Sequence, residues 1–379
     1  MSQKTQATLM LSGMIIGVGM FAIPFSFYSA GFLLGTLELF VLALVVLAIH
    51  LAYAEVVRRS REQHRLPGYA RMYLGEKAAF LATGAAFFGI SGTLLAYVLL
   101  SGIFLDSLLG RFMAQSHSSW WSMMFVLAGA VISFFPVKKK TLLTSLLTTL
   151  LIIFICILVV LLLPHVSFGA LSGWHAASVF APYGVILFAL SGSTVIPDVV
   201  AYYRGDKKRT RQVIARGSLL PAVIYFLFAL VVVGASGDRV TPDAITGLLS
   251  VAGNVVVALG SLIGLIAVST AYLLLNSSFQ AFLNLDLKVS RSLSWAGASF
   301  IPFALFLLGF QNFISVISVV GATTVAIDGG LIIAMYHMIL HRHEPTITRF
   351  DTISFGLMYT MIIAGIAYEL YRFVIVRMF

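Results

Sequence analysis

The chain has 379 residues, of which 60% are hydrophobic and 10% are charged, and its mean hydropathy is +1.02. A soluble protein of this length cannot bury so large an apolar fraction, so the composition indicates a polytopic membrane protein surrounded by lipid. The net charge of +10 could suggest a nucleic-acid partner. The basic residues instead cluster between apolar segments, as orientation signals do, so no such partner is expected.

A membrane-spanning helix needs about 20 mainly apolar residues, and the sequence predicts an all-α protein with about eleven such helices. The expected segments are residues 7–31, 33–57, 79–108, 120–136, 141–163, 178–203, 213–236, 251–282, 295–310, 314–340 and 352–373. Most of the 24 lysine and arginine residues fall in alternate connecting loops. This bias predicts a multi-pass protein of the plasma (inner) membrane with a cytoplasmic N-terminus and an external C-terminus.

The first and sixth segments each contain a sequence that interrupts a membrane helix. Residues 19–24 read GMFAIP and residues 192–197 read GSTVIP, so a glycine stands five residues before a proline in both. Gly17, Gly19 and Gly192 permit unusual backbone dihedrals and a close approach of a ligand. Backbone that leaves the helix inside a bilayer must face protein or a wet cavity. A matched pair of such breaks indicates a transporter's binding site.

The positions of the breaks divide the chain into two halves of five segments each. Residues 1–163 are expected to form the first five-helix repeat and residues 164–340 the second, within one integral domain. An odd number of helices per half makes the second half enter the membrane upside down, which is an inverted-topology repeat. Residues 341–379 are expected to hold a peripheral eleventh helix outside the repeat.

Each break exposes backbone groups that a continuous helix would consume. After the first break, free N–H groups and a positive helix-dipole end suit an anion such as a carboxylate. Before the second break, free carbonyls suit an ammonium group or another cation. The two ends together predict a receptor for a zwitterion, and an α-amino acid is the obvious one. The alternative is that glycine and proline only kink these helices or let them pack.

Three stretches resemble amino-acid permeases of the amino acid–polyamine–organocation superfamily. They are SGMIIGVGMFAIPFSFYSAGF at 12–32, FALSGSTVIPDV at 188–199 and LPGYARMYLG at 66–75, which resemble the first helix, the sixth helix and the loop after the second helix. The similarity is greatest to the amino acid/auxin permease and bacterial aromatic amino-acid permease branches. This resemblance implies the LeuT-type five-plus-five inverted repeat, with helices 1 and 6 broken, and transport by alternating access.

The resemblance also implies which residues surround the substrate. The Ile15 carbonyl and the Val18 and Gly19 amides would lie around its charged end groups. Phe188, Ala189 and Ser191 would help to bind its amino group. Tyr97, in the third segment, is a candidate for the side-chain pocket, with ordinary packing as the alternative.

Sodium-coupled relatives hold one ion between first-helix carbonyls and a pair of eighth-helix hydroxyls. Gly13 and Ile16 match the carbonyls, and Ser269 and Thr270 match the hydroxyls, which together are ligands of the kind that a hard cation requires. Hydroxyls that bond within their own helix are the alternative. Met20 stands where relatives supply an asparagine to a second sodium site, and a thioether cannot replace that amide.

Asp328 is the strongest ionisable candidate inside an apolar segment. Ionisable groups are costly in a membrane, so by default they are functional candidates. Asp328 could carry a proton or act as a gate, and a structural, hydrogen-bonded aspartate is the alternative. His50 could titrate near neutral pH, with a packing histidine as its alternative.

Two other functions compete with transport. An intramembrane serine protease could use GISG at 89–92 or GASG at 234–237, but it also needs a histidine to activate the serine. His50 and His337 are the histidines inside the expected segments, and neither has a supporting motif. A channel would need a repeated filter or a ring of subunits.

The sequence therefore predicts a monomeric secondary transporter that imports a neutral amino acid, with aromatic ones among the candidates, in symport with sodium or protons. It is not expected to be an enzyme. No cofactor is expected apart from the Na⁺ ion.

Overall fold

The computed structural model describes residues 3–343 except residues 61, 113–116, 135–139, 175–177 and 204–205, and after them only residues 356, 360, 365, 367, 368 and 371. The described residues form helices and connecting loops, with no strand among them. The α-helices are α1 (Gln3–Ile15), α2 (Ile23–Ala30), α3 (Phe32–Arg59), α4 (Leu66–Leu74), α5 (Glu76–Leu109), α6 (Ser118–Ser133), α7 (Lys140–Leu162), α8 (Phe168–Leu171), α9 (Ala181–Leu190), α10 (Ile196–Tyr202), α11 (Lys207–Ser236), α12 (Leu249–Ala281), α13 (Arg291–Leu307) and α14 (Phe313–His343). Short 3-10 helices η1 (Val18–Ala22) and η5 (Ser193–Val195) precede α2 and α10, and a π-helix, η8 (Phe282–Asp286), follows α12.

Helices cover the first ten segments expected from the sequence, with ends that differ by several residues. The eleventh expected segment, 352–373, lies almost wholly outside the described residues. Within the described part of the chain, six helices are long and apolar enough to span a membrane, and the bent pair of α1 with η1–α2 makes a seventh. The stretch 66–75, expected as a loop, instead forms α4, which begins beside Pro67 and ends at Gly75 with φ 90°. Both residues are suited to helix ends.

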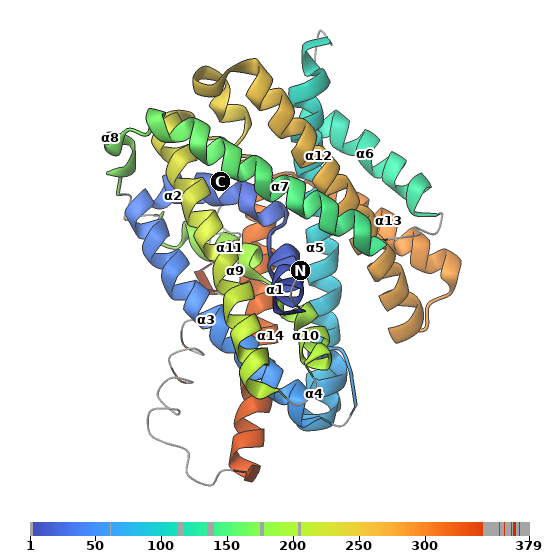
Figure 1. The fold of residues 1–379 in the computed structure, drawn as a ribbon. Helices are drawn as coiled ribbons and strands as arrows, with labels where there is room; N and C mark the ends of the chain where they lie inside the picture. Colours follow the sequence, from blue (N-terminus) through green and yellow to red (C-terminus); the bar gives the residue numbers. More distant parts are fainter. Residues whose placement is uncertain are drawn as a thin grey trace.

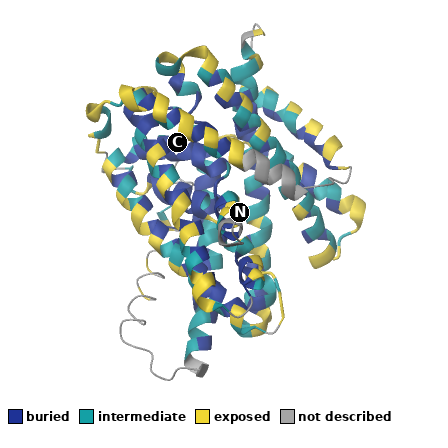
Figure 2. Cartoon of the chain, viewed as in Figure 1, coloured by how far each residue is buried: buried dark blue, intermediate teal, exposed yellow. Residues whose placement is uncertain are grey.

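The two interrupted helices lie inside the bundle. Helix α9 packs against α14 and α2, and α1 packs against α11, while α3 and α5 pack against α14 (Figure 1). Helices α6 and α13 lie together at one side, against α5 and α12. Buried residues concentrate toward the centre, and exposed residues lie on the outer faces (Figure 2). Large apolar side chains such as Phe40 and Phe80 are among the exposed ones, as lipid contact requires.

Small residues let α11 and α14 pack closely against the interrupted helices. A side chain added at Gly184 of α9 would strike the backbone of Ser318, and one added at Gly321 of α14 would strike the backbone of Gly184. On α11, Gly217 lies against Leu11, and its carbonyl accepts a hydrogen bond of 3.1 Å from the Ser12 hydroxyl. Such contacts between small residues are a common way to pack membrane helices. They fix α1 and α9 in position, and with them the backbone at the two interruptions.

Candidate functional site

The first interruption follows Ile15. The Ile16 amide makes the last hydrogen bond of α1, to the Ser12 carbonyl, and Gly17 is then extended (φ −140°, ψ −153°). The chain resumes as η1, and η1 with α2 is bent by 48° from α1. No side chain caps η1. The amides of Val18 and Gly19 precede its first hydrogen-bonded turn, so they have no partner within that helix and are suited to an anion.

The second interruption follows Leu190. Ser191 is extended (ψ 122°), and Gly192 has φ −151° and ψ 7° before η5 begins. The Ser191 amide bonds the Phe188 carbonyl in a tightened last turn of α9. The carbonyls of Ala189 and Leu190 then have no following helical turn to supply donors, so they remain as hydrogen-bond acceptors.

The second half-helices begin alike, at Ile23 in α2 and Ile196 in α10, each with proline among its first residues. Proline is tolerated there because the first helical amides have no partner. Both breaks thus consist of an extended residue, Gly17 or Ser191, a short 3-10 helix and an Ile-Pro start, although Gly19 lies within η1 whereas Gly192 precedes η5.

The two interruptions contact each other reciprocally. A β-carbon added at Gly19 would lie 2.8 Å from the Ala189 α-carbon and 2.9 Å from a Phe188 ring carbon. A β-carbon added at Gly192 would lie 2.6 Å from the Ile15 Cγ1 atom. Gly19 therefore packs against Ala189, which precedes the second break, and Gly192 packs against Ile15, which precedes the first break. This arrangement brings the amides after the first break close to the carbonyls before the second.

A tyrosine of α11 joins the two interruptions. The Tyr225 hydroxyl lies 2.7 Å from the Ile15 carbonyl oxygen and 3.0 Å from the Ala189 carbonyl oxygen. Its side chain is completely buried. A buried tyrosine needs a hydrogen-bond partner, and here both acceptors are carbonyls at the helix breaks. Tyr225 is absent from the residues predicted from sequence, because nothing in the segment 213–236 marks it among its apolar neighbours.

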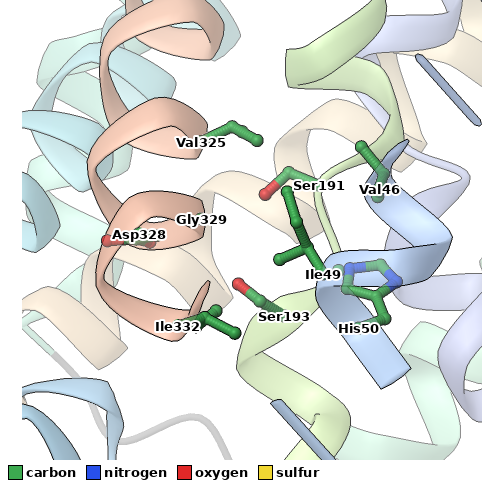
Figure 3. A pocket seen from close by; sticks show the side chains of 10 residues that line it. Val46, Ile49, His50, Ser191, Ser193, Val325, Asp328, Gly329 and Ile332 are labelled. Carbon is green, nitrogen blue, oxygen red and sulfur yellow. The ribbon is translucent and has the colours of Figure 1, made fainter. Parts of the chain in front are cut away.

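A small cavity lies beside the second interruption, between α3 and α14. Its volume is about 20 Å³, and its lining includes His50, Ser191, Gly192, Ser193 and Asp328. This volume admits about one water molecule and is too small for an amino acid. In Figure 3 the hydroxyls of Ser191 and Ser193 point toward α14. The carboxyl group of Asp328 lies on the side of α14 away from these serines (Figure 3).

Comparison with known proteins shows the family to which the chain belongs. Residues 2–290 match the sequence profile of the tryptophan/tyrosine permease family. The chain belongs to that family. The permease also shares its fold with MhsT, a LeuT-fold transporter, in its crystal structure in complex with L-phenylalanine. The TM-score is 0.62 and the sequence identity 14%, over 98% of this chain and 98% of that chain. A search of curated protein sequences found no match.

The protein is thus a multi-pass membrane permease that transports amino acids, and the resemblance noted in the sequence is confirmed. It is a transporter and not an enzyme. The described structure also gives the protease alternative no support, because His50 pairs with Ser218 at 2.9 Å and not with a serine of either GxSG string.

The permease brings most of the predicted substrate residues together. Ile15, Gly19, Phe188 and Ala189 meet through the contacts given above, and Val18 is buried in η1 next to them. Ser191 faces the small cavity instead. Tyr97, on α5, is partly buried and packs against both apolar clusters of the bundle.

The four residues proposed as sodium ligands lie in two parts of the chain, at the end of α1 and within α12. The Ser269 hydroxyl donates to the Leu265 carbonyl at 2.6 Å, and the Thr270 hydroxyl donates to the Ile266 carbonyl at 2.9 Å. Both bonds lie within α12, which is the alternative considered for this pair. Gly13 lies in α1, and Ile16 follows its end. A sodium site formed by these four residues stays a prediction.

Proposed function

We propose that this permease imports a neutral aromatic amino acid by alternating access, driven by protons. The observation that carries the proposal is the reciprocal contact of the two breaks. Gly19 packs against Ala189, so the Val18 and Gly19 amides, which have no partner within η1, lie near the carbonyls that end α9, and each set would serve one charge of a zwitterion. The helices around the first and sixth spans would rock against the rest of a monomer in the plasma (inner) membrane, with the N-terminus in the cytoplasm.

Aromatic residues next to the breaks support an aromatic substrate. Phe188 borders Gly19, and Phe21 of η1 meets Phe104 of α5 edge to face, with ring centroids 5.2 Å apart. Aromatic rings favour such edge-on contacts with other rings. The description of the family, and the L-phenylalanine bound to MhsT, agree with this class.

Asp328 is the proposed carrier of the coupled proton. It lies midway along α14 and is among the residues that line the cavity next to the second break, with its carboxyl on the side of α14 away from Ser191 and Ser193 (Figure 3). An aspartate at membrane depth is costly when charged, so protonation and release there can be linked to conformational change. The hydroxyls of Ser269 and Thr270 donate to carbonyls of α12, which is the ordinary helix-bonded arrangement and gives a sodium site no independent support.

Uptake into proteoliposomes tests the proposal. The purified permease is reconstituted, and uptake of labelled L-tryptophan, L-tyrosine, L-phenylalanine, L-leucine and L-lysine is measured with sodium and pH gradients imposed separately. Saturable uptake and counterflow of the three aromatic amino acids, driven by the pH gradient without sodium, is the expected result. Preference for leucine or lysine would contradict the substrate class, and uptake that requires sodium would contradict the proton.

A further inference from the structure

The Tyr225 hydroxyl stands at the point where the two helix breaks meet. It lies within hydrogen-bond distance of the carbonyls of Ile15 and Ala189, which belong to different breaks. Tyr225 itself belongs to α11, which is part of neither interrupted helix. A single side chain thus connects both breaks to a third helix.

The two carbonyl oxygens at this point share a single hydrogen-bond donor, the Tyr225 hydroxyl. A tyrosine hydroxyl carries one proton, whereas each carbonyl oxygen is only an acceptor. One proton shared by Ile15 and Ala189 satisfies one of the two carbonyls fully. Because Ile15 ends α1 and Ala189 is the second-last residue of α9, neither carbonyl has a following helical turn to supply the missing donor.

An ammonium group supplies what is missing. It carries three N–H donors and no acceptor, and its positive charge strengthens bonds to carbonyl oxygens. We propose that Tyr225 is a positioning residue of the substrate site, which holds the Ile15 and Ala189 carbonyls so that the substrate's ammonium completes their hydrogen bonding. This inference rests on the proposed function and adds the residue that makes an amino group a requirement for binding.

The neighbouring contacts explain how Tyr225 is held in place. On the same helix, Gly217 accepts the Ser12 hydroxyl bond, and Ser218 pairs with His50 of α3. Helix α11 is therefore fixed to α1 and α3 on the side of the breaks. A hydroxyl held by a fixed helix can set the distance between two carbonyls, which a mobile side chain could not do.

The test compares Tyr225→Phe with wild type for two ligands. The full-length permease is reconstituted, and binding and uptake are measured for L-tryptophan and for 3-indolepropionate, which lacks the amino group. Tyr225→Phe is expected to raise the KM and Kd for L-tryptophan about 10- to 100-fold, because carbonyls that are no longer held in place lose their charge-assisted bonds to the substrate ammonium. Binding of 3-indolepropionate is expected to change less than about threefold, so the variant discriminates less between the two ligands.

Tyr272→Phe is the matched control. Tyr272 is also fully buried, but it packs against Phe125 and Gly129 of α6, away from the breaks. This control is expected to keep wild-type discrimination. An unchanged KM for L-tryptophan in Tyr225→Phe, or an equal loss for both ligands, would overturn the positioning role.

Thermal unfolding in detergent verifies that each variant is folded. If Tyr225→Phe does not fold, Tyr225→His replaces it, because its ring N–H keeps a donor. That variant is expected to retain a preference for L-tryptophan over 3-indolepropionate, and loss of the preference would overturn the proposal. A wild-type protein that binds no aromatic amino acid would instead refute the proposed function, so the two failures are distinguishable.

Discussion

The backbone of Gly19 lies against the backbone of Ala189. An added β-carbon at residue 19 would be 2.8 Å from the Ala189 α-carbon, a separation that packed carbon atoms do not adopt. The obstacle is main chain and not the end of a flexible side chain, so it cannot move without displacing α9. This contact makes the fit of the two interruptions sensitive to a single methyl group.

Gly19→Ala is therefore expected to impair transport strongly. Overpacking of this kind costs about 1–3 kcal/mol, which corresponds to a roughly 5- to 160-fold reduction in uptake if it opposes the contact between the two breaks. The initial rate of L-tryptophan uptake measures it. Gly84→Ala on α5 is the control, because nothing lies within 4 Å of a β-carbon at that position. Equal activity of the two variants would argue against the contact.

Gly192→Ala is expected to be milder than Gly19→Ala. Its added β-carbon would meet side-chain atoms of Ile15 and Leu11, at 2.6 and 3.3 Å, and side chains can rotate away. The Ile15→Ala change removes the closest of these atoms. The double variant should then take up more substrate than Gly192→Ala alone, a non-additive result typical of residues in contact. An additive loss in the double variant would contradict this packing.

Asp328→Asn is expected to separate exchange from accumulation. Asparagine keeps the shape of the side chain but cannot release a proton. Counterflow of L-tryptophan between two compartments at equal pH should remain within about twofold to threefold of wild type, whereas accumulation driven by a pH gradient should be lost. Both are measured in the same proteoliposomes. If the variant still accumulates L-tryptophan in response to the pH gradient, Asp328 does not carry the coupled proton.

The double change Ser269→Ala and Thr270→Ala is expected to leave transport almost unchanged. Each hydroxyl bonds a carbonyl four residues earlier in α12, and the loss of such a bond alters stability by about 0.5 kcal/mol or less at a site without a further role. Uptake with and without a sodium gradient measures the effect. If sodium stimulates uptake by the wild type but not by the variant, the result would support the predicted four-residue sodium site.

The local features of the site could be read from the sequence. Glycine followed at a fixed distance by proline disfavours a continuous helix, whatever surrounds it, so the breaks near Gly19 and Gly192 could be predicted. The choice of Ile15, Phe188 and Ala189 followed from a resemblance covering the same short stretches. Ser193 was not predicted beside the cavity, because serine within a helix break carries no signal that separates it from Ser191.

The sequence alone determined that this is a helical membrane protein with two interrupted spans, because hydropathy and the glycine–proline pattern act over a few residues. The tertiary structure decided that Tyr225 meets Ile15, 210 positions away along the chain, and that the Asp328 carboxyl turns away from Ser191 and Ser193. Such contacts depend on how far each packed helix is rotated and shifted along its axis. The side chains at the whole interface set that rotation and shift together, and no short stretch of sequence records them.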